Sequence, residues 1–296
     1  MNEVAEKTFV FTFGRREYDL SARTYITGIL NVTPDSFSDG GRYFSADRAV
    51  EHALEMIDQG ADFIDVGGES TRPKGRAYGE GAEPVAMDEE MRRVIPVIER
   101  LAPRIDIPIS IDTYKSAVAE RALQAGAVIV NDISGFTFDA ALPSVVARAG
   151  ASAVVMHTKG TPKTMQQNPS YDDLFGEISA FLADGVERAR QAGVAQLIVD
   201  PGIGFGKKQE HNLQLINGLS RFGNLGCPIL VSPSRKSFIG NILNLPVEER
   251  LEGSIASFVA CIMNGAHIIR AHDVKEAKRA AMVADAIKRS SWNSSK

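Results

Sequence analysis

The stretch ITGILNVTPDSFSDGG, residues 26–41, decides how the chain is organised. Apolar and small residues run straight into Asn31, and the segment then becomes a polar loop with one proline, two aspartates and a glycine pair. A short buried strand that ends in a polar loop is how parallel α/β proteins present a site at the carboxyl ends of their strands. The stretch therefore predicts a parallel sheet with chemistry at its strand ends.

The segments on either side of this stretch suit that interpretation. Residues 9–20, FVFTFGRREYDL, alternate apolar and polar around Gly14, which predicts a β-hairpin that we expect to plug one end of a barrel. Ser45–Gln59 has apolar residues at helical spacing, with Ser45 as the expected N-cap and Gly60 closing the helix.

A helix, a glycine and a short β-branched strand then recur along the chain. Two further strands, PISIDTY (108–114) and CPILVSPSRKS (227–237), occupy the two longest gaps in this pattern. With the opening strand there are about eight parallel strands alternating with helices, which predicts a (β/α)8 TIM barrel. A doubly wound open sheet is the alternative, but no G-x-G-x-x-G follows an early strand. The glycines that mark the repeat are Gly60, Gly126, Gly150, Gly193 and Gly265.

The chain length fits one such unit. A barrel of this type uses about 250 residues, so we expect the 296 residues to form a single domain. Its core would cover about residues 20–288, with a disordered tail at 289–296. The remaining expected helices are Asp88–Leu101, Lys115–Gln124, Ala140–Ala149, Tyr171–Gln191, Gln209–Leu219, Val247–Asn264 and Val274–Lys288.

Composition excludes several classes of protein. A hydrophobic fraction of 44% and a charged fraction of 24% are ordinary for a globular protein, and a net charge of −4 indicates neither a nucleic-acid partner nor an anionic membrane. No run of about 18 apolar residues occurs. Cys227 and Cys261 lie in apolar surroundings typical of reduced core thiols, so we expect a cytoplasmic protein.

Polar residues stand at every expected strand end, and in a barrel these ends converge on one mouth. Taken singly, each could be structural, but the set is too large for solvated loop tips. Its members are Asn31, Glu69, Ser70, Thr71, Arg72, Asp112, Asn131, Asp132, Met156, His157, Asp200, Ser234, Arg235, Lys236, Ser237, Arg270, His272 and Asp273.

The chemistry of this set indicates a polar ring and a phosphorylated group as ligands. Asp112, Asn131 and Asp200 offer acceptors to a donor-rich heterocycle. A cationic cluster suits a phosphate or a carboxylate, and a lone oxygen ligand such as Asn31 beside a polyanion suits Mg²⁺. No zinc pattern occurs. The cationic residues are Arg72, Lys236, Arg270 and His272.

With these residues in view, the sequence resembles the dihydropteroate synthases of the folate pathway. The motifs that carry the resemblance, in order, are GILNVTPDSFSDGG (28–41), GGESTRP (67–73), SIDT (110–113), NDISG (131–135), MH-x-x-GTP (156–162), DPGIGFGK (200–207), SRKSFIG (234–240) and R-x-HDV (270–274). The resemblance implies a (β/α)8 barrel, usually a homodimer. It also implies an enzyme that joins 6-hydroxymethyl-7,8-dihydropterin diphosphate to p-aminobenzoate with release of pyrophosphate, and it makes sulfonamides expected inhibitors.

The resemblance also implies residue roles. The pterin would be bound by Asp112, Asn131, Met156, Asp200, Phe205 and Lys236. The diphosphate would be held by Asn31, Arg270 and His272, with Asn31 also the Mg²⁺ contact. The p-aminobenzoate would lie near Thr71, Arg72, Pro73, Phe205 and Ser237. The residues expected to act in catalysis are Asp39, Arg72, Lys236, Arg270 and His272, with Asp39 approaching the reacting methylene.

The physics of the reaction agrees with these roles. The amine of p-aminobenzoate is a weak nucleophile, so the enzyme must chiefly assist the leaving pyrophosphate. This favours a dissociative displacement assisted by Mg²⁺. One departure from the family pattern is the insertion KGRAYGE (74–80), which lengthens the second loop. We interpret it as a solvated flap or as a change in the access of p-aminobenzoate.

Three other functions fit the sequence less well. A methyltetrahydrofolate-dependent methyltransferase shares the barrel and the pterin residues but does not need cations for two anionic groups. A non-catalytic pterin-binding homologue would be expected to have lost one of these residues, and none is missing. A glycosidase built on two strand-end carboxylates does not explain the cationic cluster.

Overall fold

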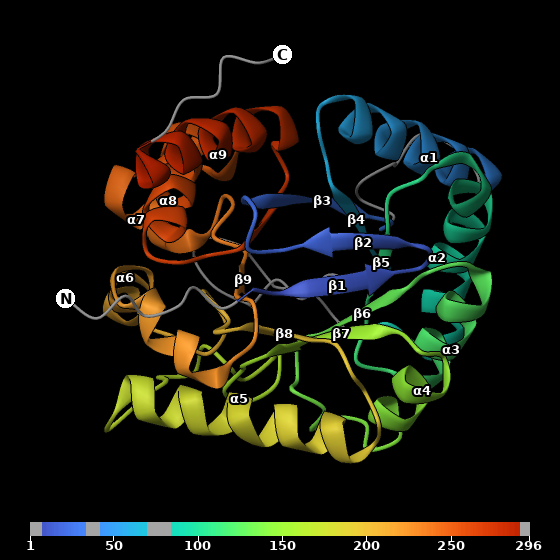
Figure 1. The fold of residues 1–296 in the computed structure, drawn as a ribbon, viewed down its shortest axis with the longest axis horizontal. Coiled ribbons are helices and arrows are strands. Elements are labelled where there is room, and N and C mark those ends of the chain that lie inside the picture. The colour runs from blue at the N-terminus through green and yellow to red at the C-terminus, as the bar shows by residue number, and fades with distance from the viewer. Residues whose placement is uncertain (1–7, 34–41, 70–83, 291–296) are drawn as a thin grey trace.

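A computed structural model describes residues 8–33, 42–69 and 84–290 (Figure 1). The strands of its central sheet are β3 (Tyr25–Asn31), β4 (Phe63–Gly67), β5 (Ile109–Asp112), β6 (Ile129–Asp132), β7 (Ser152–Met156), β8 (Leu197–Asp200), β9 (Leu230–Val231) and β10 (Ile268–Ala271). These eight strands are parallel and lie in the order β8-β7-β6-β5-β4-β3-β10-β9. A parallel bridge between Val199 and Ile229 joins the two outer strands, so the sheet closes and the predicted (β/α)8 barrel is confirmed.

Helices surround the strands (Figure 1). They are α1 (Arg42–Asp58), α2 (Met87–Leu101), α3 (Ser116–Ala125), α4 (Leu142–Arg148), α5 (Leu174–Gln191), α6 (Gln209–Asn217), α7 (Ser237–Leu243), α8 (Leu251–Met263) and α9 (Val274–Arg289), with short 3₁₀ helices η2 (Ala102–Arg104), η3 (Leu219–Leu225) and η4 (Val247–Glu249). None of the helices in the described part of the chain is both long and apolar enough to cross a membrane.

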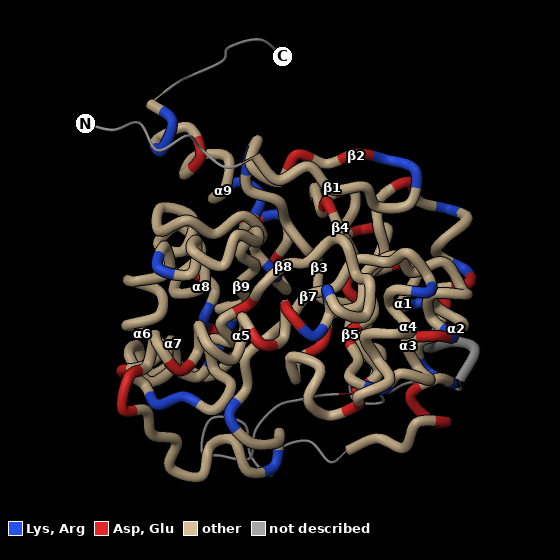
Figure 2. Tube along the Cα trace, turned by 60° about the horizontal axis from the view of Figure 1, so that its bottom comes forward, with Lys and Arg blue, Asp and Glu red and all other residues tan. Residues whose placement is uncertain are grey.

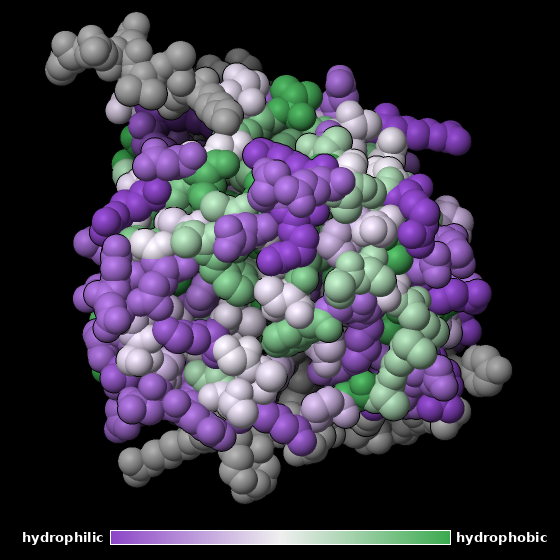
Figure 3. All heavy atoms as spheres, turned by 90° about the horizontal axis from the view of Figure 1, so that it is seen from below, coloured by the Kyte–Doolittle hydropathy of each residue, from purple (hydrophilic) through white to green (hydrophobic). Residues whose placement is uncertain are grey.

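Helix α5 shows why these segments cover the barrel. Its residues Leu174, Ile178, Leu182 and Val186 recur at helical spacing and are all buried. The surface on this side of the molecule is mostly hydrophilic, with scattered apolar residues (Figure 3). The helix begins at Leu174, later than the expected Tyr171, because the Asp173 side chain caps it by accepting a hydrogen bond from the Gly176 amide at 3.0 Å.

Two further expected helices differ from the structure by more than two residues. Helix α1 begins at Arg42, so Ser45 lies inside the helix and the predicted N-cap was wrong. The helix expected over Val247–Asn264 is divided into η4 and α8 at Arg250, whose backbone is not helical. The buried Arg250 guanidinium donates to the carbonyls of Arg235 at 3.0 Å and Leu245 at 3.2 Å, and these bonds hold the break in place.

The predicted hairpin is present as β1 (Val10–Phe13) and β2 (Arg16–Asp19). Gly14, at the turn, has a φ of 62°, which glycine adopts without strain. Phe11 and Phe13 pack with Phe63 and other residues from the starts of the barrel strands. The hairpin therefore plugs the amino-terminal end of the barrel, opposite the loops that follow the strands (Figure 2).

Along the strands, the side chains inside the barrel change from apolar to polar. Side chains that point inward alternate along a strand, and on four strands the first of an inward pair is apolar and the next is polar. Seven of these eight residues line one small cavity inside the barrel; Asp200 does not line it. The pairs are Phe63 and Asp65 on β4, Ile129 and Asn131 on β6, Ile198 and Asp200 on β8, and Ile268 and Arg270 on β10.

Candidate functional site

The centre of the candidate site is a cluster of charged side chains inside the barrel mouth. Arg270, on β10, donates from Nε to Asp65 Oδ2 at 2.5 Å and from Nη2 to Asp112 Oδ2 at 2.7 Å. Asn131, on β6, donates from Nδ2 to the same Asp65 oxygen at 3.0 Å. Residues from four strands thus meet in one network, and three of them, Asp112, Asn131 and Arg270, were expected from the sequence.

Asp65 is the member of this network that sequence reasoning missed. It lies within β4 between Ile64 and Val66, and its side chain is 1% exposed. A charged residue inside an otherwise apolar buried strand needs a partner. The contrast between Asp65 and its apolar neighbours is visible in the sequence, but it does not identify the partners of Asp65.

A second group lies around the loop after β8. Asp200 is buried at the strand end, where its Oδ1 accepts a hydrogen bond from the Gly202 amide at 2.7 Å. Lys236, the residue before α7, donates to the Ile203 carbonyl, and its Nζ lies 4.6 Å from the centre of the Phe205 ring. Gly204 has a φ of 86°, and a Cβ there would lie 2.8 Å from the Lys236 side chain. Glycine therefore lets the lysine lie across this loop.

Burial shifts the pKa values of these groups. It raises the pKa of Asp112 to about 7, although Arg270 acts in the opposite direction. It lowers the pKa of Lys236 to about 8, against the attraction of Asp200. The pKa of Asp200 is also raised by burial. Groups with pKa values displaced toward neutrality by burial and by charged partners are typical of functional sites.

The remaining described candidates lie at the walls and rim. Met156 is buried at the end of β7, beside Asp200 in the sheet register. His272 is exposed just beyond β10, and its Nδ1 lies 2.9 Å from Ser234 Oγ. Ser237 is partly exposed as the first residue of α7. His272 is thus at the rim, whereas Arg270 lies among carboxylates inside the barrel.

The neighbours of Asn31 bear on its expected role as a Mg²⁺ contact. A Cβ on Gly67 would lie 3.8 Å from Asn31 Oδ1 and 3.6 Å from Asp112 Oδ2, so the Asn31 oxygen lies beside a carboxylate at the barrel mouth. Oxygen ligands suit Mg²⁺, which takes its other ligands from water and substrate phosphates. Within the described ranges no group of three or more His, Cys, Asp or Glu side chains could hold a metal. The residues present fit an ion that is bound mainly by its substrate.

A buried ion cluster anchors the start of the second loop. Lys115 Nζ lies 2.5 Å from both Glu69 Oε2 and Glu90 Oε2, and the Tyr114 hydroxyl donates to Glu69 Oε1 at 3.0 Å. Glu69 is followed by residues 70–83, and so Thr71, Arg72, Pro73 and the insertion 74–80 lie outside the described residues. Asp39 lies outside them as well.

His157, one of the expected strand-end residues, pairs with Lys207, a partner that sequence reasoning missed. Lys207 Nζ lies 2.9 Å from His157 Nδ1 and donates to the Phe205 carbonyl at 2.9 Å. Both side chains are buried, and burial lowers the pKa of His157 to about 2 and that of Lys207 well below its ordinary value. The pair holds the carbonyl of Phe205 and thereby orders the loop that carries this expected substrate wall.

Comparison with known proteins places this site in a family. Residues 27–272 match the family described as pterin binding enzyme. The chain is 49% identical over 279 residues to the dihydropteroate synthase of Clostridium beijerinckii, covering 93% of this chain and 98% of that protein.

Solved structures agree. The dihydropteroate synthase of Yersinia pestis in a sulfonamide drug complex has a TM-score of 0.87 at 44% identity, covering 96% of this chain and 100% of that one. The enzyme from Clostridium difficile, solved in the presence of pteroic acid, has a TM-score of 0.83 at 46% identity, covering 94% of this chain and 98% of that one.

Proposed function

This chain belongs to the dihydropteroate synthase family of pterin-binding enzymes, and we propose that it joins 6-hydroxymethyl-7,8-dihydropterin diphosphate to p-aminobenzoate, giving 7,8-dihydropteroate and pyrophosphate. It is thus a transferase of an alkyl group. The observation that carries the proposal is the convergence of Asp112, Asn131, Asp200 and Lys236 on the mouth where Arg270 lies. Carboxylates and an amide beside two cations suit a donor-rich ring that carries an anionic leaving group.

The pterin would bind deepest. Asp112 and Asp200 are the acceptors for its ring N–H and amino groups, because Asp200 is buried and Asp112 largely so, and a charge-assisted hydrogen bond is stronger away from water. Asn131 and Lys236 supply further polar contacts. Met156 and Phe205 would form the apolar walls on either side of the ring.

The diphosphate would lie toward the rim, between Arg270 and the exposed His272. In the proposed step, the C–O bond between the methylene and the diphosphate breaks, and pyrophosphate leaves with the electron pair. Arg270 and His272 stabilise the charge that develops on the leaving oxygen. Mg²⁺, when bound at Asn31, would supply additional positive charge to the same group.

The amine nitrogen of p-aminobenzoate then forms the new C–N bond and loses a proton. The electron-rich dihydropterin stabilises positive charge on the methylene, so we propose that the C–O bond breaks first. From the sequence, Asp39 would lie near the methylene and Arg72, with Thr71 and Pro73, would close over the p-aminobenzoate. The carboxylate of this substrate would lie near Ser237. Pyrophosphate release that always required p-aminobenzoate would contradict this order.

One assay tests the function. Purified protein with Mg²⁺, the dihydropterin diphosphate and p-aminobenzoate is followed for 7,8-dihydropteroate and pyrophosphate. We expect equimolar products, and we expect EDTA to reduce the rate and added Mg²⁺ to restore it. Folded protein that forms no dihydropteroate would overturn the proposal.

The same proposal includes an inhibitor class and an assembly. Sulfonamides resemble p-aminobenzoate and are expected to compete with it, as the complex formed by the Yersinia pestis relative suggests. The family resemblance supports a homodimer. Among the described residues, Val283 and Ile287 on α9 are each 61% exposed, which is compatible with an apolar contact between subunits. Light scattering on the purified protein measures the assembly state.

A further inference from the structure

The two oxygens of Asp65 have different surroundings. Oδ2 accepts from Arg270 Nε at 2.5 Å and from Asn131 Nδ2 at 3.0 Å. Oδ1 is buried and accepts no hydrogen bond from the described residues. The carboxylate therefore directs its hydrogen bonding to two residues that the proposed function assigns to substrate, and it makes no such contact elsewhere in the described chain.

The position of Asp65 strengthens this interaction. On the side toward the hairpin, the barrel is filled by Phe13, Phe63, Ile129 and Ile268, all of which are buried. Apolar surroundings of low dielectric constant make an ion pair electrostatically stronger and an unpaired charge more costly. Asp65 is 1% exposed, so water does not compete for Oδ2, and the orientation of the Arg270 guanidinium is held firmly.

Substrate binding would change the other partner of Arg270. In this structure the guanidinium also donates to Asp112 at 2.7 Å. If Asp112 accepts hydrogen bonds from the pterin, as the proposed function requires, it becomes a weaker partner for Arg270. Asp65 does not lie at the rim and has no assigned contact with the substrate, so its bond to Arg270 is retained.

We propose that Asp65 is a positioning residue, which aligns Asn131 for the pterin and Arg270 for the diphosphate through one carboxylate oxygen, and which stays paired with Arg270 when the pterin engages Asp112. This inference rests on the proposed function and deepens it. Asp65 forms no bond to the substrate and transfers no proton. Its effect reaches the reaction only through the two residues that it holds.

The test compares Asp65→Asn with Asp62→Asn. Asp62 lies three positions earlier in the chain, just before β4, and is also a poorly exposed carboxylate bound to cations, but at the opposite end of the barrel. In Asp65→Asn we expect KM for the dihydropterin diphosphate to rise about 10- to 100-fold, the range of one hydrogen bond to a charged group. KM for p-aminobenzoate should change less than about twofold. Asp62→Asn should leave both constants unchanged while lowering the melting temperature.

A second variant separates charge from position. Asp65→Glu keeps the negative charge but moves the carboxylate by one methylene, for which the cavity of about 20 Å³ beside Asp65 gives some space. We expect it to show the same rise in KM as Asp65→Asn, because a displaced carboxylate cannot hold Arg270 and Asn131 together. This variant also serves as the test if Asp65→Asn does not fold.

A third readout does not depend on turnover. The dissociation constant of pteroic acid, measured by calorimetry, should increase in both Asp65 variants by a factor similar to the change in KM. Circular dichroism confirms that each protein is folded. Wild-type KM and pteroic acid affinity in a folded Asp65 variant would overturn the inference and leave the proposed function intact. Wild-type protein that forms no dihydropteroate would instead overturn the proposed function.

Discussion

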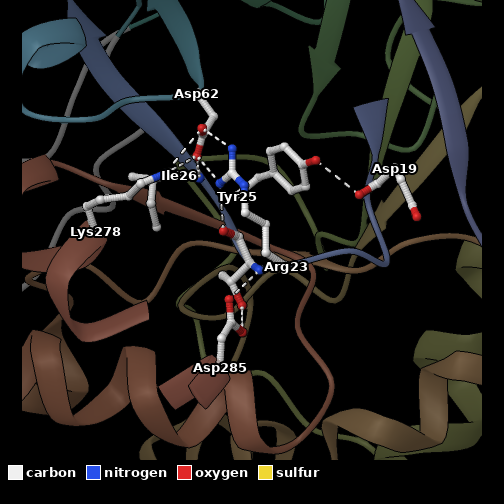
Figure 4. Close-up of polar contacts among 8 residues, drawn as sticks. Asp19, Arg23, Tyr25, Ile26, Asp62, Lys278 and Asp285 are labelled. Atoms are coloured by element: carbon white, nitrogen blue, oxygen red, sulfur yellow. Dashed lines mark hydrogen bonds and ion pairs between the residues drawn. The ribbon is translucent and has the colours of Figure 1, made fainter. Parts of the chain in front are cut away.

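Asp62 and Asp65 stand three positions apart in the chain but belong to opposite ends of the barrel, and their surroundings differ sharply. Both Asp62 oxygens accept hydrogen bonds: Arg23 donates at 2.6 and 3.0 Å, the Ile26 amide at 2.8 Å, and Lys278 at 3.0 and 3.2 Å (Figure 4). Asp65 uses one oxygen and leaves the other without a partner in the described chain. At the closed end of the barrel, which the hairpin plugs, both oxygens of the carboxylate are hydrogen-bonded, whereas toward the mouth only one is.

The network at the closed end ties separate segments together. Asp285 of α9 accepts from the Thr24 amide and hydroxyl at 2.8 Å each, and the Tyr25 hydroxyl donates to the Asp19 carbonyl at 3.0 Å (Figure 4). Burial alone would raise the pKa of Asp62, but its hydrogen bonds with Arg23 lower it. These contacts link the hairpin, β3 and α9, and so they contribute to stability.

This contrast indicates that the two ends of the barrel contribute differently, one to stability and the other to activity. When charged partners shift the pKa of a group away from neutral pH, the charged form of that group stabilises the fold. Charges with pKa values moved toward neutrality, such as those of Asp112 and Lys236, cost the fold stability, and the proposed function assigns both residues to substrate. Substitutions at the mouth should therefore change activity, and matched substitutions at the closed end should change stability.

The largest effect is expected from the lysine pair. Lys236→Ala removes a partly buried cation from the mouth, and kcat/KM should fall by about 100-fold or more, the range for one preorganised charged contact. Lys278→Ala removes a cation from Asp62 at the closed end and should leave kcat/KM within about twofold. Steady-state kinetics on both variants measure the difference. Equal losses of activity would show that the two ends are not distinct.

The next effect is on stability. Asp62→Ala removes the carboxylate that pairs Arg23 and Lys278, and we expect the free energy of unfolding to fall by about 2–3 kcal/mol. This is less than the full cost of breaking a buried pair, because the Arg23 side chain is 41% exposed and is hydrated once released. Urea denaturation gives the value. A change below about 0.5 kcal/mol would assign the network no role in stability.

The pH dependence of stability should have opposite signs at the two ends. The pKa of Asp112 is about 7 when folded, above its ordinary 3.8. Ionisation of Asp112 thus destabilises the fold as pH rises from about 4 to 7. Relative to wild type, Asp112→Asn should gain stability as pH rises through this window.

For Asp62 the folded pKa lies below 3.8, so its stabilising contribution is present above that pH and is lost as pH falls through the folded value. The deficit of Asp62→Asn should therefore be full at pH 5 and shrink in stronger acid. Denaturation of each variant and of wild type at several pH values between about 3 and 7.5 gives both slopes. Parallel slopes for the two variants would contradict the comparison.

The smallest effect concerns the insertion 74–80. Surface loops tolerate changes in length because the entropic cost of loop closure varies slowly. Deleting these residues should leave kcat within about twofold, and any change should appear in KM for p-aminobenzoate. A large fall in kcat would show that the insertion takes part in the chemistry.

Much of this architecture was predictable from sequence. The repeat of helix, glycine and β-branched strand gives the barrel, because strand length and chain direction are local properties. The convergence of strand ends then groups Asp112, Asn131 and Arg270 without any knowledge of distances. The partners of Asp65 were not predictable, since Arg270 lies 205 residues away and the pairing depends on which side of each strand faces inward.

Errors at element ends have similarly specific causes. Ser45 was a reasonable N-cap on residue type, yet α1 starts earlier, at Arg42. The break at Arg250 depends on the carbonyls of Arg235 and Leu245, which lie before and after α7. Sequence periodicity does not report such tertiary hydrogen bonds.

The bridge that closes the barrel is a place where the sheet can open locally. Strand β9 has only two residues, and its side of the seam meets β8 through the Val199–Ile229 bridge and the hydrogen bond from the Val199 amide to the Pro228 carbonyl at 3.0 Å. Asp200 follows directly on one side of this seam, and Lys236 lies beyond the other. A ligand that binds both residues would bridge β8 and β9, where the barrel is joined by few hydrogen bonds. Ligand binding at the mouth and closure of the barrel would then stabilise each other.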